Sequence, residues 1–200
     1  MMRKKPMLAY PVSDKPIDYS DKVSIQPKLD GVRCLIQREG DDLGFRVVAY
    51  SRTGKEWKNI DHILKELVPF FMKYPQVILD GELYNHDLRD NFEKIISLVR
   101  KTKPQPEDRL ESAEIVQFHC YDIIDETLTF EERNYFIKKQ VPTSYCVKHL
   151  KTFGISGESG AKAHHKTNLL MGYEGSIVRT NNTYHCNRSY NLRKFKDFHD

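Results

Sequence analysis

The chain lacks several features that would place it in a specialised class of protein. Its four cysteines, Cys34, Cys120, Cys146 and Cys186, stand too far apart for a CxxC pair, which argues against a zinc ribbon. The basic amino end, MMRKKPMLAYPV, has no apolar stretch after it and so does not read as a signal peptide. No apolar run approaches the ~20 residues of a membrane-spanning helix. We therefore expect a cytosolic protein with reduced thiols and no membrane partner.

Composition and charge describe an ordinary folded protein. Hydrophobic residues make up 39% of the 200 positions and charged residues 30%, which argues against a disordered chain. The formal net charge of +4 permits a polyanionic partner without demonstrating one. The sequence shows neither an internal repeat nor an obvious linker, so we expect one domain over residues 1–200.

Hydrophobic periodicity predicts many strands interleaved with a few helices. Three prolines break any regular element in residues 1–21, which we expect to be a loop. The expected strands are residues 23–29, 32–38, 45–51, 76–79, 114–124, 145–150, 176–179 and 190–198, the first three starting a β-meander. The expected helices are residues 61–74, 91–100, 129–139 and 159–171, with a polar surface connection at 101–113. Without βαβ regularity, this order predicts an α+β domain with antiparallel sheets.

One lysine stands between an apolar strand and a glycine turn, in residues 26–33 (QPKLDGVR). Lys28 suits a nucleophile if its pKa falls from the reference ~10.4 toward neutrality, by roughly 3 units or about 4 kcal/mol. Cations lower a lysine pKa because they disfavour the ammonium form, and Arg33, Lys194 and Lys196 supply cations. Two plainer interpretations stay open: Lys28 is a solvated turn charge, and the tail NLRKFKDF is a lysine-protected sheet edge.

Two acidic sites lie at expected strand ends. Glu82 follows Asp80-Gly81 after an apolar strand, and Glu174 precedes the strand at residues 176–179. Carboxylates in such positions suit a hard cation such as Mg²⁺, which binds few protein oxygens. Alternatively, each is an ordinary turn acid before or after a strand.

Aromatic and histidine residues complete the set of candidates. Within FHCYD, Phe118 and Cys120 should face one side of a strand, and His119 and Tyr121 the other. Tyr121 is then either a core residue or a stacking partner for a base. We interpret His119 as structural and the pair His164-His165 as a polar surface feature.

Taken together, six strings resemble the covalent nucleotidyltransferase superfamily, and most closely the adenylation domain of compact viral or phage ATP-dependent DNA ligases. In chain order they are PKLDGVR, SRTGKEW, ILDGELY, FHCYDII, EGSIVR and NLRKFKDF, and they span nearly the whole chain. The resemblance implies an α+β nucleotidyltransferase (ATP-grasp-like) domain, with antiparallel sheets flanked by helices around a nucleotide cleft. It also implies a host-cell cytoplasmic or nuclear location if the protein is viral.

The resemblance implies roles for the residues around the lysine. Lys28 would attack the α-phosphate of ATP to form a lysyl-AMP and release pyrophosphate. Lys194 and Lys196 would bind the α-phosphate and offset charge as the leaving group departs. Glu174 would hold Mg²⁺, and Asp30 would be needed at the site in an undefined role.

It also implies contacts to the rest of the nucleotide and to DNA. Gln26 would lie near the adenine edge and Tyr121 would stack on the base. Glu82 would serve the ribose or a metal ion. Arg33 and Arg52 would contact phosphate, including the 5′-phosphate of nicked double-stranded DNA, a role suited to a guanidinium. AMP would pass to that 5′-phosphate, and the adjacent 3′-hydroxyl would seal the nick in DNA repair, replication or recombination.

Two departures and three alternatives accompany this interpretation. Arg179 stands where relatives often have lysine, and the chain stops at Asp200, before the OB-fold domain that usually follows, so we expect weak self-adenylation. An RNA ligase and a GTP-dependent mRNA-capping guanylyltransferase share the lysine motif. A non-catalytic nick- or nucleotide-binding module is the third alternative. We expect a monomer, since no heptad pattern is present.

Overall fold

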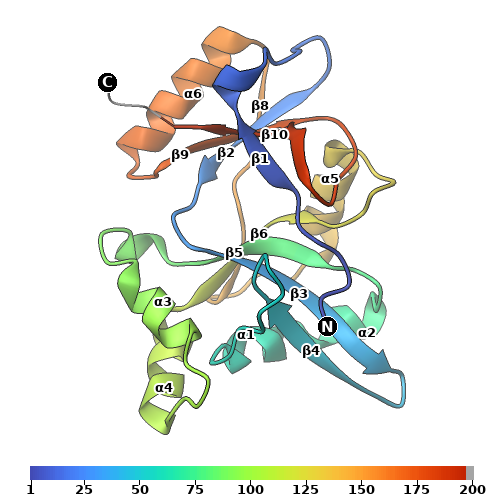
Figure 1. The fold of residues 1–200 in the computed structure, drawn as a ribbon, viewed down its shortest axis with the longest axis vertical. Coiled ribbons are helices and arrows are strands. Elements are labelled where there is room, and N and C mark those ends of the chain that lie inside the picture. Colours follow the sequence, from blue (N-terminus) through green and yellow to red (C-terminus); the bar gives the residue numbers. More distant parts are fainter. Residues whose placement is uncertain (197–200) are drawn as a thin grey trace.

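The computed structural model describes residues 1–196 and shows two five-stranded sheets, one above the other in Figure 1. The upper sheet has the order β1 (Leu8–Pro11), β10 (Arg188–Phe195), β9 (Gly175–Thr180), β2 (Val23–Lys28) and β8 (Phe153–Ile155). The lower sheet has the order β4 (Gly44–Tyr50), β3 (Val32–Asp41), β5 (Leu79–Tyr84), β6 (Gln117–Ile123) and β7 (Val147–His149). Neighbouring strands are antiparallel except for the parallel pairs β1–β10 and β6–β7.

Helices cover the outer side of each sheet. The upper sheet packs against α6 (Glu158–Leu170), and β4 of the lower sheet packs against α1 (Asp61–Glu66) and α2 (Val68–Lys73). A helix pair formed by α3 (Glu93–Val99) and α4 (Pro106–Ile115) lies beside the lower sheet, and α5 (Phe130–Gln140) packs on β6. Short 3-10 helices follow β1 (Val12–Asp14) and β5 (His86–Leu88). In residues 1–196, no helix has both the length and the apolar composition needed to cross a membrane.

The largest apolar core lies under the lower sheet. Side chains of β3, β5 and β6 such as Ile36, Leu83 and Phe118 pack against Ile63 and Phe71 of the helices, each fully buried. Fully burying an aliphatic or aromatic side chain of this size contributes about 1.5–3 kcal/mol. The upper sheet has a much smaller buried cluster, which consists of Val23, Ile25 and Val178. The lower sheet is therefore the better anchored of the two.

The predicted β-meander is wrong, because the chain changes sheets after β2. Strand β2 pairs with β9 and β8 in the upper sheet, whereas β3 pairs with β4 and β5 in the lower one. The crossing passes through Gly31, where a Cβ atom would lie 2.3 Å from the backbone oxygen of Leu83. Glycine therefore permits the close backbone approach that this crossing requires.

Three other predictions of secondary structure need correction. Residues 1–21 contain β1, because pairing with β10 stabilises an extended segment between Pro6 and Pro11, with Pro11 as the last residue of the strand. Residues 101–113 contain most of α4, where Pro106 occupies the first turn, in which no N–H is needed, and Gln105 forms a capping box. The predicted helix 61–74 is divided in two at Leu67, just before Pro69.

The predicted tail strand does not lie at a sheet edge. Within the described residues, β10 lies between β1 and β9, so the interpretation of NLRKFKDF as a lysine-protected edge is wrong. The predicted alternation at Asp197 and Phe198 lies outside the described residues. The helices at residues 91–100, 129–139 and 159–171 are confirmed to within a few residues as α3, α5 and α6.

Candidate active site

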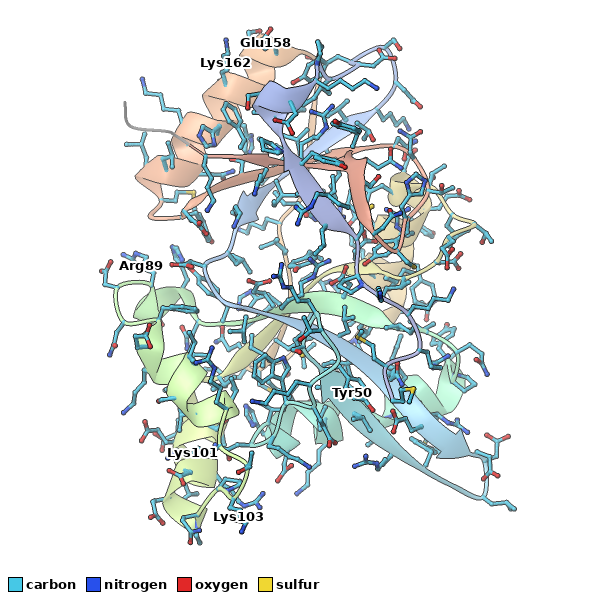
Figure 2. All side chains as sticks on the ribbon, in the orientation of Figure 1. Tyr50, Arg89, Lys101, Lys103, Glu158 and Lys162 are labelled. Carbon is cyan, nitrogen blue, oxygen red and sulfur yellow. The ribbon has the colours of Figure 1, made fainter. Side chains whose placement is uncertain are left out.

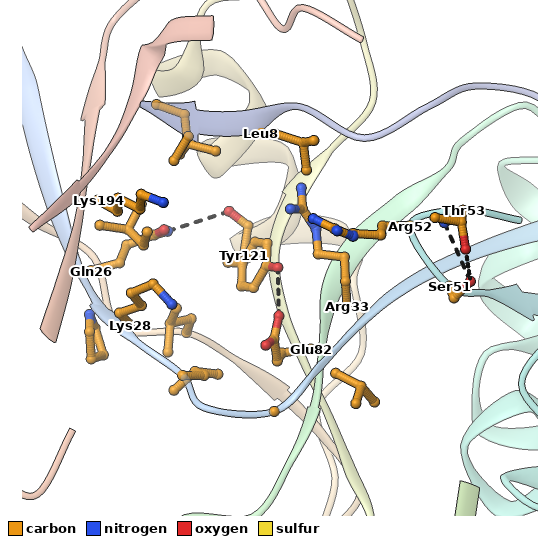
Figure 3. A pocket seen from close by; sticks show the side chains of 18 of the residues that line it. Leu8, Gln26, Lys28, Arg33, Ser51, Arg52, Thr53, Glu82, Tyr121 and Lys194 are labelled. Carbon is orange, nitrogen blue, oxygen red and sulfur yellow. Dashed lines mark hydrogen bonds between the residues drawn. The ribbon is translucent and has the colours of Figure 1, made fainter. Parts of the chain in front are cut away.

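A cavity of about 710 Å³ lies between the two sheets, within the ~300–1,000 Å³ of typical ligand pockets (Figure 3). We call its upper-sheet residues the upper wall: Gln26, Lys28, Ile177, Arg179, Leu192 and Lys194. We call its lower-sheet residues Arg33, Glu82 and Tyr121 the lower wall. The remaining polar groups of its lining come from the turn of residues 51–55, from Arg100, and from Arg188 of β10, whose guanidinium donates to the Ala9 backbone oxygen.

The alternation of side chains along the strands explains why the residues of the upper wall face the cavity. Gln26 pairs with Ile177, which pairs with Lys194, so one row of cavity residues crosses β2, β9 and β10. Residues two positions apart on a strand face the same side, so Lys28 faces the cavity with Gln26. Ile25, one position before Gln26, faces the small core instead. The sequence therefore folds so that the candidate nucleophile and a second lysine share one face.

Lys28 and Lys196 share one carboxylate. Lys28 Nζ donates a hydrogen bond to Glu174 Oε2 over 3.1 Å, and Lys196 pairs with Oε1 of the same residue. Burial alone would raise the pKa of Glu174, but the hydrogen bonds from Lys196 and Lys28 outweigh it, so this pKa is lowered. Lys28 and Glu174 remain about a quarter exposed. An ionised carboxylate therefore contacts the candidate nucleophile at neutral pH.

The lower wall places a carboxylic acid and an aromatic ring opposite the lysines (Figure 3). Tyr121 Oη donates to Glu82 Oε1 over 2.9 Å. Burial raises the pKa of Glu82 to about 7, although Arg33 and the Tyr121 hydroxyl oppose this shift. The register of β5 and β6 shifts between Asp80 and Gly81, which leaves Tyr121 without an opposite residue. Such a bulge re-aims a side chain, here into the cavity.

The guanidinium of Arg33 makes most of its hydrogen bonds to acceptors within the protein. Its Nε and Nη2 donate to the two carboxylate oxygens of fully buried Asp80 over 2.7 and 2.8 Å, and Nη2 also reaches the backbone oxygen of Met7. Asp80 accepts a third hydrogen bond, 2.7 Å long, from the Tyr184 hydroxyl. Arg33 thus joins the lower wall to the amino-terminal segment of the upper half. Its predicted phosphate contact stays a prediction, with most of its donors already engaged.

A second buried aspartate stands opposite Asp80 in the β5–β6 register. Asp122 binds Arg133 of α5 over 2.7 Å and Arg179 over 2.6 Å, and all three side chains are at most 3% exposed. Arg179 Nε also donates to Gln26 Oε1 over 2.8 Å. Gln26, predicted to lie near the adenine edge, lines the cavity but is 1% exposed, with its amide fixed in the wall.

The other predicted site residues lie further out. Arg52 is exposed and lines the cavity mouth. Asp30 is exposed and is not among the residues that line the cavity. Lys196 contacts the site through Glu174 rather than from the cavity wall. The structure therefore brings Lys28, Lys194, Glu82, Tyr121 and Arg33 together and leaves Asp30 apart.

The predicted metal ligands are two separate carboxylates. Glu82 belongs to the lower wall, and Glu174 directly precedes β9. Residues 1–196 contain no group of three or more His, Cys, Asp or Glu side chains that could hold a metal ion by themselves. Mg²⁺ accepts carboxylate oxygens and needs only one or two of them when phosphates and water complete its shell. The two residues therefore fit a nucleotide-bound Mg²⁺, and their metal role stays a prediction.

One histidine prediction is wrong, and some cavity residues were missed. His165 is 3% exposed, stacks on Phe195 with ring centres 3.7 Å apart and hydrogen-bonds Ser176, so it is no surface feature. Ile177 lines the cavity, and the alternation in EGSIVR could have placed it beside Arg179. Thr152 does not line the cavity but holds Gln26 in place, since its hydroxyl accepts from Gln26 Nε2 over 2.9 Å, and no local sequence pattern indicates this contact.

Comparison with protein families gives one match over nearly the whole chain. A family model described as "ATP dependent DNA ligase domain" matches residues 6–196. The chain is similar to DNA ligases of African swine fever virus: it is 28% identical over 171 residues to that of isolate Pig/Kenya/KEN-50/1950 and 28% identical over 187 residues to that of isolate Warthog/Namibia/Wart80/1980. These alignments cover 82% and 88% of this chain but only 38% and 42% of the viral proteins. The chain thus spans about two fifths of the length of these relatives.

Solved structures share the fold. A structure described as "DNA binding with a minimal scaffold: Structure-function analysis of Lig E DNA ligases" has a TM-score of 0.73 and 21% identity, covering 98% of this chain and 70% of that chain. An ATP-dependent DNA ligase from bacteriophage T7, in complex with ATP, has a TM-score of 0.70 and 15% identity, covering 96% and 68%. The predicted α+β nucleotidyltransferase fold is confirmed.

Proposed function

We propose that this chain, which belongs to the family of ATP-dependent DNA ligase domains, is the adenylation domain of a DNA ligase that uses ATP and seals nicked double-stranded DNA. The observation that carries the proposal is the position of Lys28. Its amine faces a ligand-sized cavity beside Lys194 and contacts ionised Glu174. A module that only bound nucleotides or nicks would not need a lysine held in this way.

The proposed first step is nucleophilic attack by Lys28. The lone pair of the neutral amine forms a bond to the α-phosphorus of ATP, and the bond from that phosphorus to the bridging oxygen of the β-phosphate breaks. Pyrophosphate leaves with the electron pair, and the amine loses one proton to solvent. Lys194 supplies positive charge from the same wall as the oxygens of the α-phosphate gain charge, and Lys196 does so once phosphate replaces its carboxylate partner.

The remaining wall residues suit the other parts of the nucleotide. Tyr121 presents an aromatic ring to the cavity, which suits stacking on a purine. Glu82, with a pKa of about 7, suits a hydrogen bond to a ribose hydroxyl better than a metal contact. Glu174, with a lowered pKa, is the better oxygen donor for Mg²⁺. When bound, that ion would neutralise phosphate charge near Lys28.

The partner and setting follow from the same proposal. AMP passes from Lys28 to the 5′-phosphate of nicked double-stranded DNA, and the 3′-hydroxyl then displaces it, as in DNA repair, replication or recombination. We place a monomer in the cytoplasm or, if the protein is viral, in the host cytoplasm or nucleus. The four free cysteines agree with a reducing compartment.

The decisive experiment looks for a nucleotide on Lys28. The chain is incubated with Mg²⁺ and either ATP or GTP, and its tryptic peptides are examined by mass spectrometry. We expect an acid-labile AMP adduct on Lys28 from ATP only, and its loss in Lys28→Ala. Lys22→Ala is the matched control, because Lys22 lies one residue before β2 and pairs with Glu131 outside the cavity.

Three outcomes separate the alternatives. A GMP adduct would instead indicate a capping guanylyltransferase. An AMP adduct with sealing of nicked RNA alone would indicate an RNA ligase. Absence of any adduct on Lys28, in this chain and in a longer protein that contains it, would contradict the enzyme and favour a binding module.

A further inference from the structure

The mouth of the cavity carries cations that the ATP chemistry does not use. Lys55 and Arg100 line the cavity from the lower half, are exposed, and come from places 45 positions apart in the chain. Arg52 and Lys55 belong to one turn, and Arg100 caps the end of α3. Within residues 1–196, no carboxylate lies within ion-pair distance of Arg52, Lys55 or Arg100. Three cations therefore stand at one opening without an internal counter-charge.

The nearby acids are engaged elsewhere. Glu56, next to Lys55, pairs with Arg46 over 3.3 Å and with Lys58 over 3.1 Å. Asp108 of α4 pairs with Lys101, the residue after Arg100, over 3.5 Å and caps its own helix. The cations at the mouth thus remain available to an external anion.

Hydrogen bonds fix the backbone of the turn of residues 51–55, which carries two of these cations. Ser51 Oγ accepts hydrogen bonds from the backbone N–H groups of Thr53 and Lys55, and the Ser51 N–H donates to the Lys55 oxygen over 2.7 Å. Gly54 adopts φ +92°, a conformation that closes the turn and that side chains rarely adopt. Arg100 stands at the carboxyl end of α3, where the helix dipole favours a cation. A pre-organised site loses less entropy when an anion binds.

We propose that Lys55 and Arg100 bind backbone phosphates of the DNA strand whose 5′-phosphate is brought to the cavity. This inference rests on the proposed function, and it deepens it by naming DNA contacts that the sequence motifs do not assign. A nucleotide bound at Lys28 would have its phosphates beside the upper wall, where Lys194 faces the same space. The exposed cations of the lower half instead open toward solvent, as an extended polyanion requires. Backbone contacts of this kind contribute affinity and position without reading sequence.

The experiment measures binding of a nicked duplex with a 5′-phosphate, by fluorescence anisotropy over a range of salt concentrations. We expect Lys55→Ala and Arg100→Ala each to weaken binding roughly threefold to tenfold and to lower the salt slope by about 0.9. Two duplexes of unrelated sequence should lose the same factor. Arg100→Lys, which keeps the charge, should restore most of the affinity.

Matched controls remove the same charge from the same segments. Lys58→Ala removes a lysine that pairs with Glu56, and Lys103→Ala removes an exposed lysine at the lower end of the molecule in Figure 2. Neither residue lines the cavity, and we expect less than a twofold change from either. Thermal unfolding of every variant excludes a folding defect as the cause.

Two results would overturn the inference. The first is a loss of binding no larger in the Lys55 and Arg100 variants than in their controls. The second is an equal loss of AMP labelling at Lys28, which would assign the two cations to ATP. Either result leaves the adduct on wild-type Lys28 intact, so it is distinguishable from failure of the proposed function, in which wild type itself forms no adduct.

Discussion

The two walls of the cavity hold their charges in different ways. On the upper side, Lys28 and Lys196 share Glu174, with side chains that are 23%, 37% and 27% exposed. On the lower side, Asp80 and Asp122 are fully buried and bind arginines through charge-assisted hydrogen bonds. Solvated lysine pairs exchange partners at little cost, whereas a buried charge loses several kcal/mol when its partner is removed. The buried carboxylates Asp80 and Asp122 are therefore structural, and Arg179 of the upper wall belongs to their cluster, whereas the contacts that Glu174 makes with Lys28 and Lys196 are replaceable.

This contrast suits the proposed chemistry. Lys28 and Lys196 must leave Glu174 when phosphate arrives, which a half-solvated ion pair allows. The ring of Tyr121 must keep its position meanwhile, and guanidinium groups of Arg33 and Arg179 lie 5.6 and 5.4 Å from its centre. Because Arg179 belongs to the upper sheet and Asp122 to the lower, their ion pair also fixes one sheet against the other.

The largest effect that we predict comes from breaking the buried cluster. Asp122→Asn leaves Arg133 and Arg179 buried without a counter-charge, and we expect the free energy of unfolding to fall by about 3–5 kcal/mol. Glu174→Gln is the matched change in the upper half. It should alter stability by about 1 kcal/mol or less but slow AMP labelling of Lys28 roughly tenfold or more. Urea unfolding and labelling rates measure the two quantities, and equal stability losses would refute the contrast.

A second prediction uses pH to separate Glu82 from Glu174. The pKa of Glu82 is raised by burial to about 7 in the folded protein, against 4.5 for a free glutamate, so the folded state binds more protons between these values. Its contribution to stability is present below about pH 4.5 and is lost as pH rises through 7, by at most about 3 kcal/mol. The contribution of Glu174 to stability depends on pH in the opposite direction. Because its pKa is lowered, this contribution is present above pH 4.5 and is lost on acidification.

The measurement is the free energy of unfolding in urea at several pH values. Glu82→Gln should remove the decline between pH 4.5 and 7, and Glu174→Gln should leave that decline in place. An unchanged profile in Glu82→Gln would contradict the assignment.

Local patterns in the sequence predicted the parts of this site that lie on one strand. Period-two alternation separated Phe118 and Cys120 from Tyr121, and this prediction agrees with the structure. The strand expected at residues 76–79, with Asp80-Gly81-Glu82 at its end, was placed wrongly, because β5 spans Leu79–Tyr84 and contains all three residues.

What could not be predicted depends on contacts between distant segments. Asp80 is bound by Arg33, 47 positions away, and by Tyr184, 104 positions away. His165 is buried because Phe195 stacks on it. The crossing at Gly31 likewise depends on the backbone of Leu83. No local periodicity encodes such partners. The sequence therefore indicated the residue types at the site, but not which of them are engaged in contacts within the protein.

A third prediction, with a smaller expected effect, concerns the hydrogen bond to the other buried aspartate, Asp80. Tyr184→Phe removes one of the three side-chain donors to Asp80 and the acceptor of the Met7 N–H, while Arg33 stays in place. We expect a loss of about 2 kcal/mol in the free energy of unfolding. Tyr135→Phe, at a tyrosine that is 63% exposed, is the control and should change it by less than about 0.5 kcal/mol. A loss as large as that of Asp122→Asn would show that Asp80 depends on the hydroxyl rather than on Arg33.

The smallest effect that we predict concerns a solvent-exposed ion pair, which serves as a reference for the pairs at the cavity. Glu158 and Lys162 lie one turn apart on the exposed face of α6, 3.1 Å from each other, with side chains 73% and 66% exposed (Figure 2). A double-mutant cycle with Glu158→Gln and Lys162→Gln should give a coupling energy of about 0.3–0.5 kcal/mol, reduced further in 1 M salt. If exposure decides what an ion pair contributes, the Lys28–Glu174 pair should lie between this value and that of the Asp122 cluster. A coupling above about 1 kcal/mol on α6 would mean that exposure alone does not separate the two walls.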